Sequence, residues 1–109
     1  MKRRSPIKPR SAKGEAYQQE YLEASHRVAE RSGGLCEIRA EHPCTGAASL
    51  YPHHRKLRSQ GGSNDPDRNL LDCCPRGHDW IHALPRLKAY DLQLIIPRDQ
   101  DEYPYDPPI

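Results

Sequence analysis

Apolar residues recur with a helical period near the N-terminus. They are spaced four, three and four positions apart, so they share one face of a helix. The members of this stripe are Tyr17, Tyr21, Ala24 and Val28. Charged residues lie off the stripe, and the pair Gly33-Gly34 supplies a C-terminal stop. The pattern predicts an amphipathic helix over residues 15–32 that packs through its apolar face.

Short apolar runs separated by turn-forming residues follow this helix. Residues 35–38 and 47–51 are expected to form two short strands around a loop, and residues 69–71 a further extended piece. Residues 55–68 are rich in Arg, Lys, Gly, Ser, Asn and Asp, so we expect an irregular loop there.

Helical segments are expected again after a turn at Pro75 and Gly77. A helix is predicted from about His78 to Leu84, where Pro85 interrupts it.

The C-terminal part of the chain is expected to be less regular. Residues 86–91 suit one more helical turn, and residues 92–96 a strand or a packing segment. Residues 97–109 combine proline with acidic residues, which predicts a tail that is flexible or becomes ordered on contact.

The chain has few residues with which to build an apolar core. Leu, Ile, Val and Phe together make up 17 of its 109 residues, a fraction at which an ordinary core becomes doubtful. Small domains of this kind often depend on disulfides or metal ions. Attention therefore turns to the four cysteines and six histidines.

Positive charge is concentrated at the N-terminus. Residues 1–13 carry +6 and no acidic residue, and the net charge is +2, so the rest of the chain carries −4. We expect residues 1–14 to be a flexible basic arm that contacts nucleic acid through Lys2, Arg3 and Arg4, or else merely a solubility tail.

No apolar stretch is long enough to span a membrane, and no secretory core follows the basic start. We therefore expect a cytoplasmic protein in a reducing compartment. Cysteines there are more often metal ligands or buried thiols than disulfides.

The histidines carry the clearest chemical signal. His78 and His82 are four residues apart, so on a helix they can bind one metal ion. His53 can supply a third imidazole from an extended segment, where its neighbour His54 points to the other side. His54 is then free to act as a base toward water. Isolated histidines such as His26 are expected to have no such role.

Successive blocks of the sequence resemble those of HNH endonucleases, most closely the compact forms found in bacteriophage genomes. The resemblance covers about half the chain, from Leu35 to Leu84. The blocks are His53-His54-Arg55, Ser59-Gln60-Gly61-Gly62-Ser63, Asn69-Leu70-Leu71 and His78-Asp79-Trp80-Ile81-His82. Several ordered blocks at these spacings are far more specific than one histidine pair.

The resemblance implies an α+β fold, a small ββα-metal domain over residues 15–96 to which an N-terminal helix is added. It implies that His54 is the general base and that Asn69 helps to place it. It implies further that a divalent ion (Mg, Mn, Ni or Zn) binds to His53, His78 and His82.

The cysteines suggest a second, structural zinc ion, as the resemblance also implies. Cys36, Cys44 and Cys74 align with zinc ligands, but Gly77 stands where a fourth cysteine belongs. Cys73, His42 or a water molecule can complete the set, with Cys73 as the first choice, although His42 on its own would be an ordinary surface histidine. Alternatively, the cysteines are buried thiols or partly disulfide-bonded.

Three functions remain open from the sequence. The leading one is a DNA endonuclease whose basic residues Arg55, Lys56 and Arg58 contact phosphates, although a merely solvated basic loop fits them as well. The others are a non-catalytic zinc module that binds nucleic acid or protein, and a nuclease that acts on RNA or serves as a toxin. Partners in phage packaging or recombination are an expectation by analogy alone.

Overall fold

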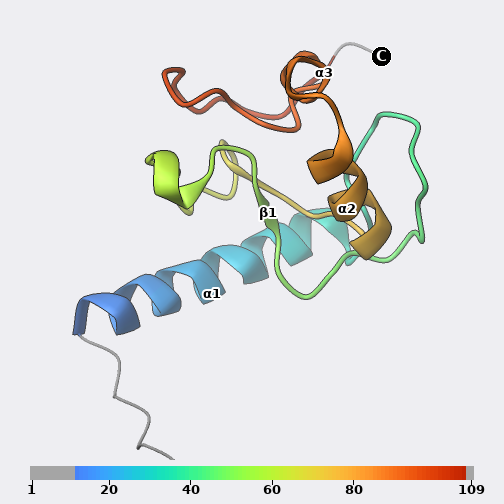
Figure 1. Cartoon of the computed structure of the whole chain (residues 1–109). Coiled ribbons are helices and arrows are strands. Elements are labelled where there is room, and N and C mark those ends of the chain that lie inside the picture. The colour runs from blue at the N-terminus through green and yellow to red at the C-terminus, as the bar shows by residue number, and fades with distance from the viewer. Residues whose placement is uncertain (1–11, 108–109) are drawn as a thin grey trace, which may run out of the picture.

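The longest element is α1, Ala12–Ser32, in a computed structural model that describes residues 12–107. The helix confirms the one predicted from the apolar stripe, and Ala24 and Val28 of that stripe are buried. It ends, as expected, at two glycines with positive φ, Gly33 and Gly34. Figure 1 shows α1 running along one side of the molecule, below β1.

The centre of the fold is a short antiparallel pair, β1 (His53–His54) and β2 (Leu70–Leu71). His53 pairs with Leu71, and His54 with Leu70. The intervening loop contains a 3-10 turn at Arg58–Gln60. Because neighbouring strand residues point to opposite sides, the two histidines face different surroundings: His53 is 4 % exposed, whereas His54 is half-buried.

The prediction of two strands, at residues 35–38 and 47–51, is wrong. In the described residues they are reduced to one bridge, between Leu35 and Ala47. The ladder does not continue because the N–H of Gly46, which would donate to the carbonyl of Cys36, donates to the sulfur of Cys44 (3.3 Å), while on its other side the segment bonds to the carbonyl of Asp72 through the N–H of Glu37 (2.7 Å). The segment is extended but divides its hydrogen bonds between two partners.

Two helices follow the hairpin, α2 (Pro75–Ala83) and α3 (Arg86–Asp91). The sequence pattern predicted a turn at Pro75 and a helix beginning near His78. This prediction is wrong, because α2 already begins at Pro75. Proline is compatible with the first position of a helix because no backbone donor is needed there. Cys74 caps this helix, since its sulfur accepts a hydrogen bond from the N–H of Gly77 (3.1 Å).

The main core lies between the hairpin, α2 and α3. Residues 94–96 are buried in or beside it without forming a strand, so they are a packing segment. The core consists of Ile38, Leu71, Cys73, Ile81, Ala89, Leu94 and Ile95. The small size of this cluster agrees with the low apolar content of the sequence. Within residues 12–107, no helix has the length and apolar character needed to cross a membrane.

The segment after α3 returns to the loop between β1 and β2 (Figure 1). Glu102 accepts hydrogen bonds from the backbone N–H (2.7 Å) and the hydroxyl (2.6 Å) of Ser63. Arg68 donates to the carbonyl of Glu102 (2.7 Å). The C-terminal segment therefore braces the long loop that follows β1.

Two candidate metal centres and a half-buried histidine

Three histidines converge where β1 meets α2. One nitrogen from each of His53, His78 and His82 lies within 4.8 Å of the others. The Nε2 atoms of His78 and His82 are 3.1 Å apart. Two nitrogens bound to one zinc ion at the usual length lie about 3.3 Å apart in tetrahedral geometry, so the spacing suits a shared ion. The three histidines expected as ligands are thus brought together.

His53 has the environment of a metal ligand. Its Nε2 lies 2.8 Å from the carbonyl of Leu94, which can only accept, so this nitrogen carries the proton and Nδ1 keeps its lone pair. Ligating histidines commonly donate their other N–H in this way. Burial lowers the pKa of His53 to about 3, and the neighbouring His78 and His82 add to the effect. The ring therefore stays neutral, as metal binding requires.

Burial also lowers the pKa of His78, while His82 is exposed at the open side of the group. The group therefore offers three protein ligands and reaches the protein surface at His82. Structural zinc sites usually have four protein ligands, whereas catalytic ones usually have three.

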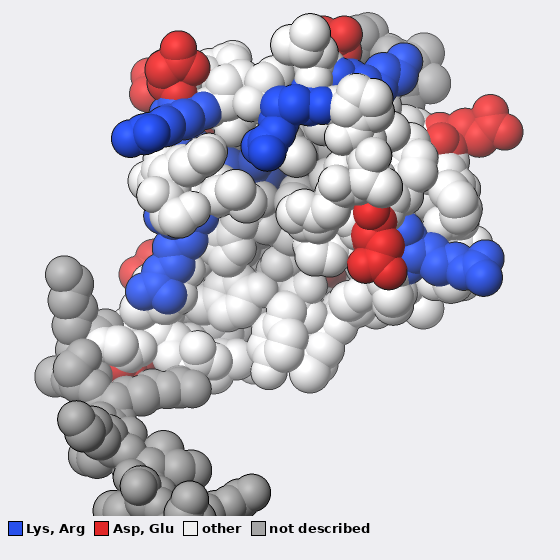
Figure 2. Space-filling model, viewed as in Figure 1, with Lys and Arg blue, Asp and Glu red and all other residues white. Residues whose placement is uncertain are grey.

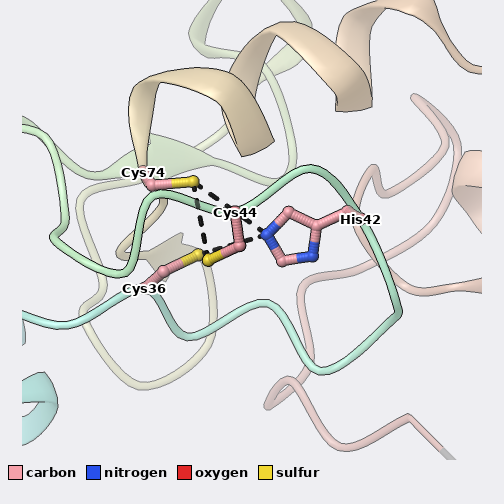
Figure 3. A group of neighbouring side chains, drawn as sticks. All are labelled: Cys36, His42, Cys44 and Cys74. Atoms are coloured by element: carbon pink, nitrogen blue, oxygen red, sulfur yellow. Dashed lines mark hydrogen bonds between the residues drawn. The ribbon is translucent and has the colours of Figure 1, made fainter.

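A second group joins the loop after α1 to the start of α2 (Figure 3). It consists of Cys36, His42, Cys44 and Cys74. The sulfurs of Cys44 and Cys74 are 3.8 Å apart, and Nε2 of His42 lies 3.6 Å from the sulfur of Cys36. A tetrahedral zinc ion separates two sulfurs by about 3.8 Å and a sulfur from a nitrogen by about 3.6 Å. The four residues can hold a metal ion such as zinc.

The side chain of His42 is oriented for this role. Its Nδ1 donates to the carbonyl of Ala40 (2.6 Å), which leaves Nε2 facing the sulfurs, and its ring stacks on Trp80 with centroids 5.4 Å apart. Burial raises the pKa of Cys36. Burial acts the same way on Cys74, but hydrogen bonds, chiefly from Thr45 and Gly77, outweigh it and lower the pKa of Cys74 to about 6.

Cys73, the first choice as fourth ligand, lies outside this group. The residue is 2 % exposed, its thiol donates to the carbonyl of Leu71 (3.5 Å), and burial raises the pKa of this thiol well above the usual range. Because Cys73 and Cys74 are adjacent in extended backbone, their side chains point to opposite sides. Cys73 belongs to the core, and His42 takes the fourth position.

His54, the expected base, is separated from the three-histidine group by strand alternation. Its Nε2 lies 2.9 Å from Oδ1 of Asn64. Its ring stacks on Tyr21 with centroids 5.2 Å apart and an interplanar angle of 18°. Neither contact was foreseen from the sequence, where Tyr21 served only as a packing residue of the helix and Asn64 as part of an irregular loop.

Asn69 ties the two ends of the long loop together. Its Oδ1 accepts from the N–H of Lys56 (2.7 Å), and its Nδ2 donates to the carbonyls of Lys56 (3.1 Å) and Ser63 (2.8 Å). The side chain is 1 % exposed. Asn69 therefore fixes the loop that begins directly after His54, and within residues 12–107 its side chain makes no hydrogen bond to the His54 ring.

Arg55 does not have the exposure that a phosphate contact requires. It is 1 % exposed, and its guanidinium donates to the carbonyls of Gln93 (2.7 Å), Arg68 (3.2 Å) and Tyr103. The ring of Tyr103 also lies 4.6 Å from the guanidinium carbon. The sequence-based assignment of Arg55 as a phosphate contact is therefore corrected: Arg55 anchors the C-terminal segment.

The other basic candidates differ in exposure. Arg58 is exposed and lies over the ring of Tyr17 at 3.6 Å, whereas Lys56 is half-buried and donates to the carbonyl of Gln100 (2.8 Å). On the face in Figure 2, Lys and Arg are interspersed with Asp and Glu rather than gathered in one patch. Lys2, Arg3 and Arg4 lie outside the described residues.

Comparison of the chain with family models, with curated proteins and with solved structures found no match. Any functional assignment therefore depends on the residues themselves and on their geometry.

Proposed function

We propose that the chain is a metal-dependent endonuclease of the HNH type that hydrolyses phosphodiester bonds in DNA. One observation carries the proposal. Adjacent histidines of β1 have different partners, His53 in the three-histidine group and His54 on the other side with Asn64 and Tyr21. A metal-binding module without catalysis needs the first histidine but gives no reason for the second.

The order of elements supports the same proposal. The antiparallel pair β1 and β2 is followed by α2, and the three candidate ligands come from β1 and α2 alone. This arrangement fits a ββα-metal domain, to which α1 and the C-terminal segment are additions.

In the proposed reaction His54 takes a proton from the attacking water, which a neutral imidazole can do near neutral pH. His53, His78 and His82 hold the divalent ion, which supplies charge stabilisation at the scissile phosphate when bound. Asn69 keeps the loop after His54 in place. Imidazole-rich ligation favours Zn²⁺, Ni²⁺ or Mn²⁺ over Mg²⁺.

The group of three cysteines and His42 serves a structural role in this proposal. It links the loop after α1 to the first turn of α2, the helix that carries His78 and His82. A zinc ion there would fix the orientation of α2 in a domain with a small apolar core.

The test is a plasmid-cleavage assay that keeps the structural site loaded. Protein containing one equivalent of zinc is supplied with Mg²⁺, Mn²⁺, Ni²⁺ or further Zn²⁺ and mixed with supercoiled DNA, with an RNA of similar length in parallel. We expect metal-dependent nicking of DNA by the wild type. His54→Ala should lose about 100-fold or more of this activity, and His26→Ala, which alters an exposed histidine of α1, should lose none.

Absence of cleavage by folded, zinc-loaded protein with all four metals would overturn the proposal, and so would equal cleavage by His54→Ala. Cleavage of RNA alone would keep the nuclease but correct its substrate.

A further inference from the structure

We propose that Asn64 is the positioning residue of His54 and that α1 restricts the same ring through Tyr21. Asn64 holds the ring with its proton on Nε2, so that Nδ1 is the nitrogen left to act as base. The orientation of the ring follows from the structure alone, and its catalytic consequence depends on the proposed nuclease function.

The first argument is the direction of the hydrogen bond. Oδ1 of Asn64 is an acceptor only, so the nitrogen 2.9 Å away, Nε2 of His54, must be the donor. The hydroxyl of Tyr17 also reaches this oxygen, at 3.3 Å. Two donors thus fill the acceptor positions of Oδ1. Within residues 12–107, Nδ1 of His54 has no hydrogen-bond partner.

The second argument is the confinement of the ring plane. Tyr21 stacks on His54, and its own hydroxyl donates to the carbonyl of Pro52 (3.0 Å), directly before β1. A ring held by stacking on one face and by a hydrogen bond at one edge keeps little rotational freedom. Such restriction is what positions a catalytic base.

The third argument is the rigidity of the loop that carries Asn64. Its neighbour Ser63 is held from two sides, by Glu102 through backbone N–H and hydroxyl and by Nδ2 of Asn69 at the carbonyl. Asn64 is itself 4 % exposed. The loop that carries its amide is therefore held by contacts other than the hydrogen bond to His54.

The fourth argument is a cost that stability alone does not explain. Nδ2 of Asn64 is buried and has no hydrogen-bond partner within the described part of the chain. A buried unpaired donor is unfavourable, by roughly 1–3 kcal/mol. Features of this kind tend to be retained at functional sites.

The experiment observes the His54 ring directly, by NMR on the full-length chain with ¹⁵N-labelled histidine rings. At a pH high enough to leave the ring uncharged, we expect the wild type to carry its proton on Nε2. Asn64→Asp keeps an oxygen acceptor and should keep this form. Asn64→Leu is similar in size but has no acceptor, so it should lose the distinct Nε2-bound proton signal. Tyr17→Phe is the matched control, because it removes the other donor to Oδ1 and leaves His54 bonded.

Cleavage kinetics then test the catalytic consequence. Asn64→Leu should lower kcat about tenfold or more, part of the roughly 10²- to 10⁴-fold that a positioned base contributes, while KM changes little because Asn64 is buried. Asn64→Ala replaces Asn64→Leu if backbone spectra show that the leucine variant is unfolded.

A wild-type ring protonated on Nδ1, or an unchanged His54 spectrum in the folded Asn64→Leu or Asn64→Ala variant, would overturn the proposal. The NMR result does not depend on cleavage. A protein without nuclease activity that shows the expected spectra would contradict only the proposed function.

Discussion

Gly77 leaves the space that the imidazole of His42 occupies. A Cβ atom at Gly77 would lie 3.1 Å from Cδ2 of His42 and 2.7 Å from Cδ1 of Ile38. Both distances are shorter than ordinary contacts between carbon atoms. The absence of a side chain at Gly77 therefore makes room for His42 beside the three cysteines.

The contact between Gly77 and His42 predicts that a substitution at one position can compensate for a substitution at the other. His42→Ala should lower the zinc content and the thermal stability of the protein, because a ligand is lost from a site that is expected to stabilise the fold. Adding Gly77→Cys to His42→Ala should restore part of the zinc binding, since the imidazole no longer fills the space beside Gly77 and Cδ1 of Ile38, the end of a flexible side chain, can shift away from the new Cβ. Metal analysis and the thiolate-to-cobalt absorption of Co²⁺-substituted protein measure both effects.

Cys73→Ala is the control for this rescue and should keep the full zinc content, because Cys73 lies in the core. Loss of zinc in the control with retention in His42→Ala would reverse the assignment of the fourth ligand.

A second prediction separates metal binding from catalysis. His82→Ala should weaken Ni²⁺ binding to zinc-loaded protein by more than the roughly 10- to 100-fold that loss of an outer partner costs. His54→Ala should leave Ni²⁺ affinity unchanged, since its ring faces Asn64. Isothermal titration calorimetry measures both. Equal weakening by the two substitutions would mean that His54 is also a ligand.

What the sequence could predict depended on local spacing. The four-residue interval between His78 and His82 gives a shared helix face, and strand alternation separates His53 from His54; both follow from backbone geometry alone. The structure agrees with each of these expectations.

What it could not predict depends on contacts between distant segments. The carbonyl of Leu94 accepts a hydrogen bond from His53, 41 residues away in the sequence, and Tyr17 lies 47 residues from Asn64. Arg55 looked like a surface cation because nothing in its neighbourhood along the chain indicates that the C-terminal segment covers it. The prediction of Cys73 as the fourth ligand of the cysteine group was wrong for a similar reason, since only the direction of each side chain distinguishes Cys73 from Cys74.

The burial of Arg55 gives a third prediction. Arg55→Lys should lower the free energy of unfolding by about 2 kcal/mol or more, because lysine cannot reproduce the several hydrogen bonds that the guanidinium donates to backbone carbonyls. Urea unfolding measures the change. Arg58→Lys, at an exposed position, should alter stability little. If Arg55→Lys instead reduced DNA affinity without loss of stability, Arg55 would be a phosphate contact after all.

The last prediction concerns alkaline pH and the contact between α1 and β1. Burial raises the pKa of Tyr21 from 10.0 to about 12, and its neighbour Tyr17 adds to the effect. The folded state therefore holds this proton more tightly than the unfolded state, so the stabilisation is complete below about pH 10 and is lost as the pH rises toward 12. Tyr21→Phe carries no such proton but keeps the ring that stacks on His54. We expect the stability advantage of wild type over Tyr21→Phe, measured by urea unfolding, to shrink between about pH 9 and pH 11.5. Groups that titrate in both proteins cancel from this difference. A constant difference would show that the Tyr21 hydroxyl is not held in the protonated state by the fold, and that the contact between α1 and the strand carrying His54 is looser than its geometry indicates.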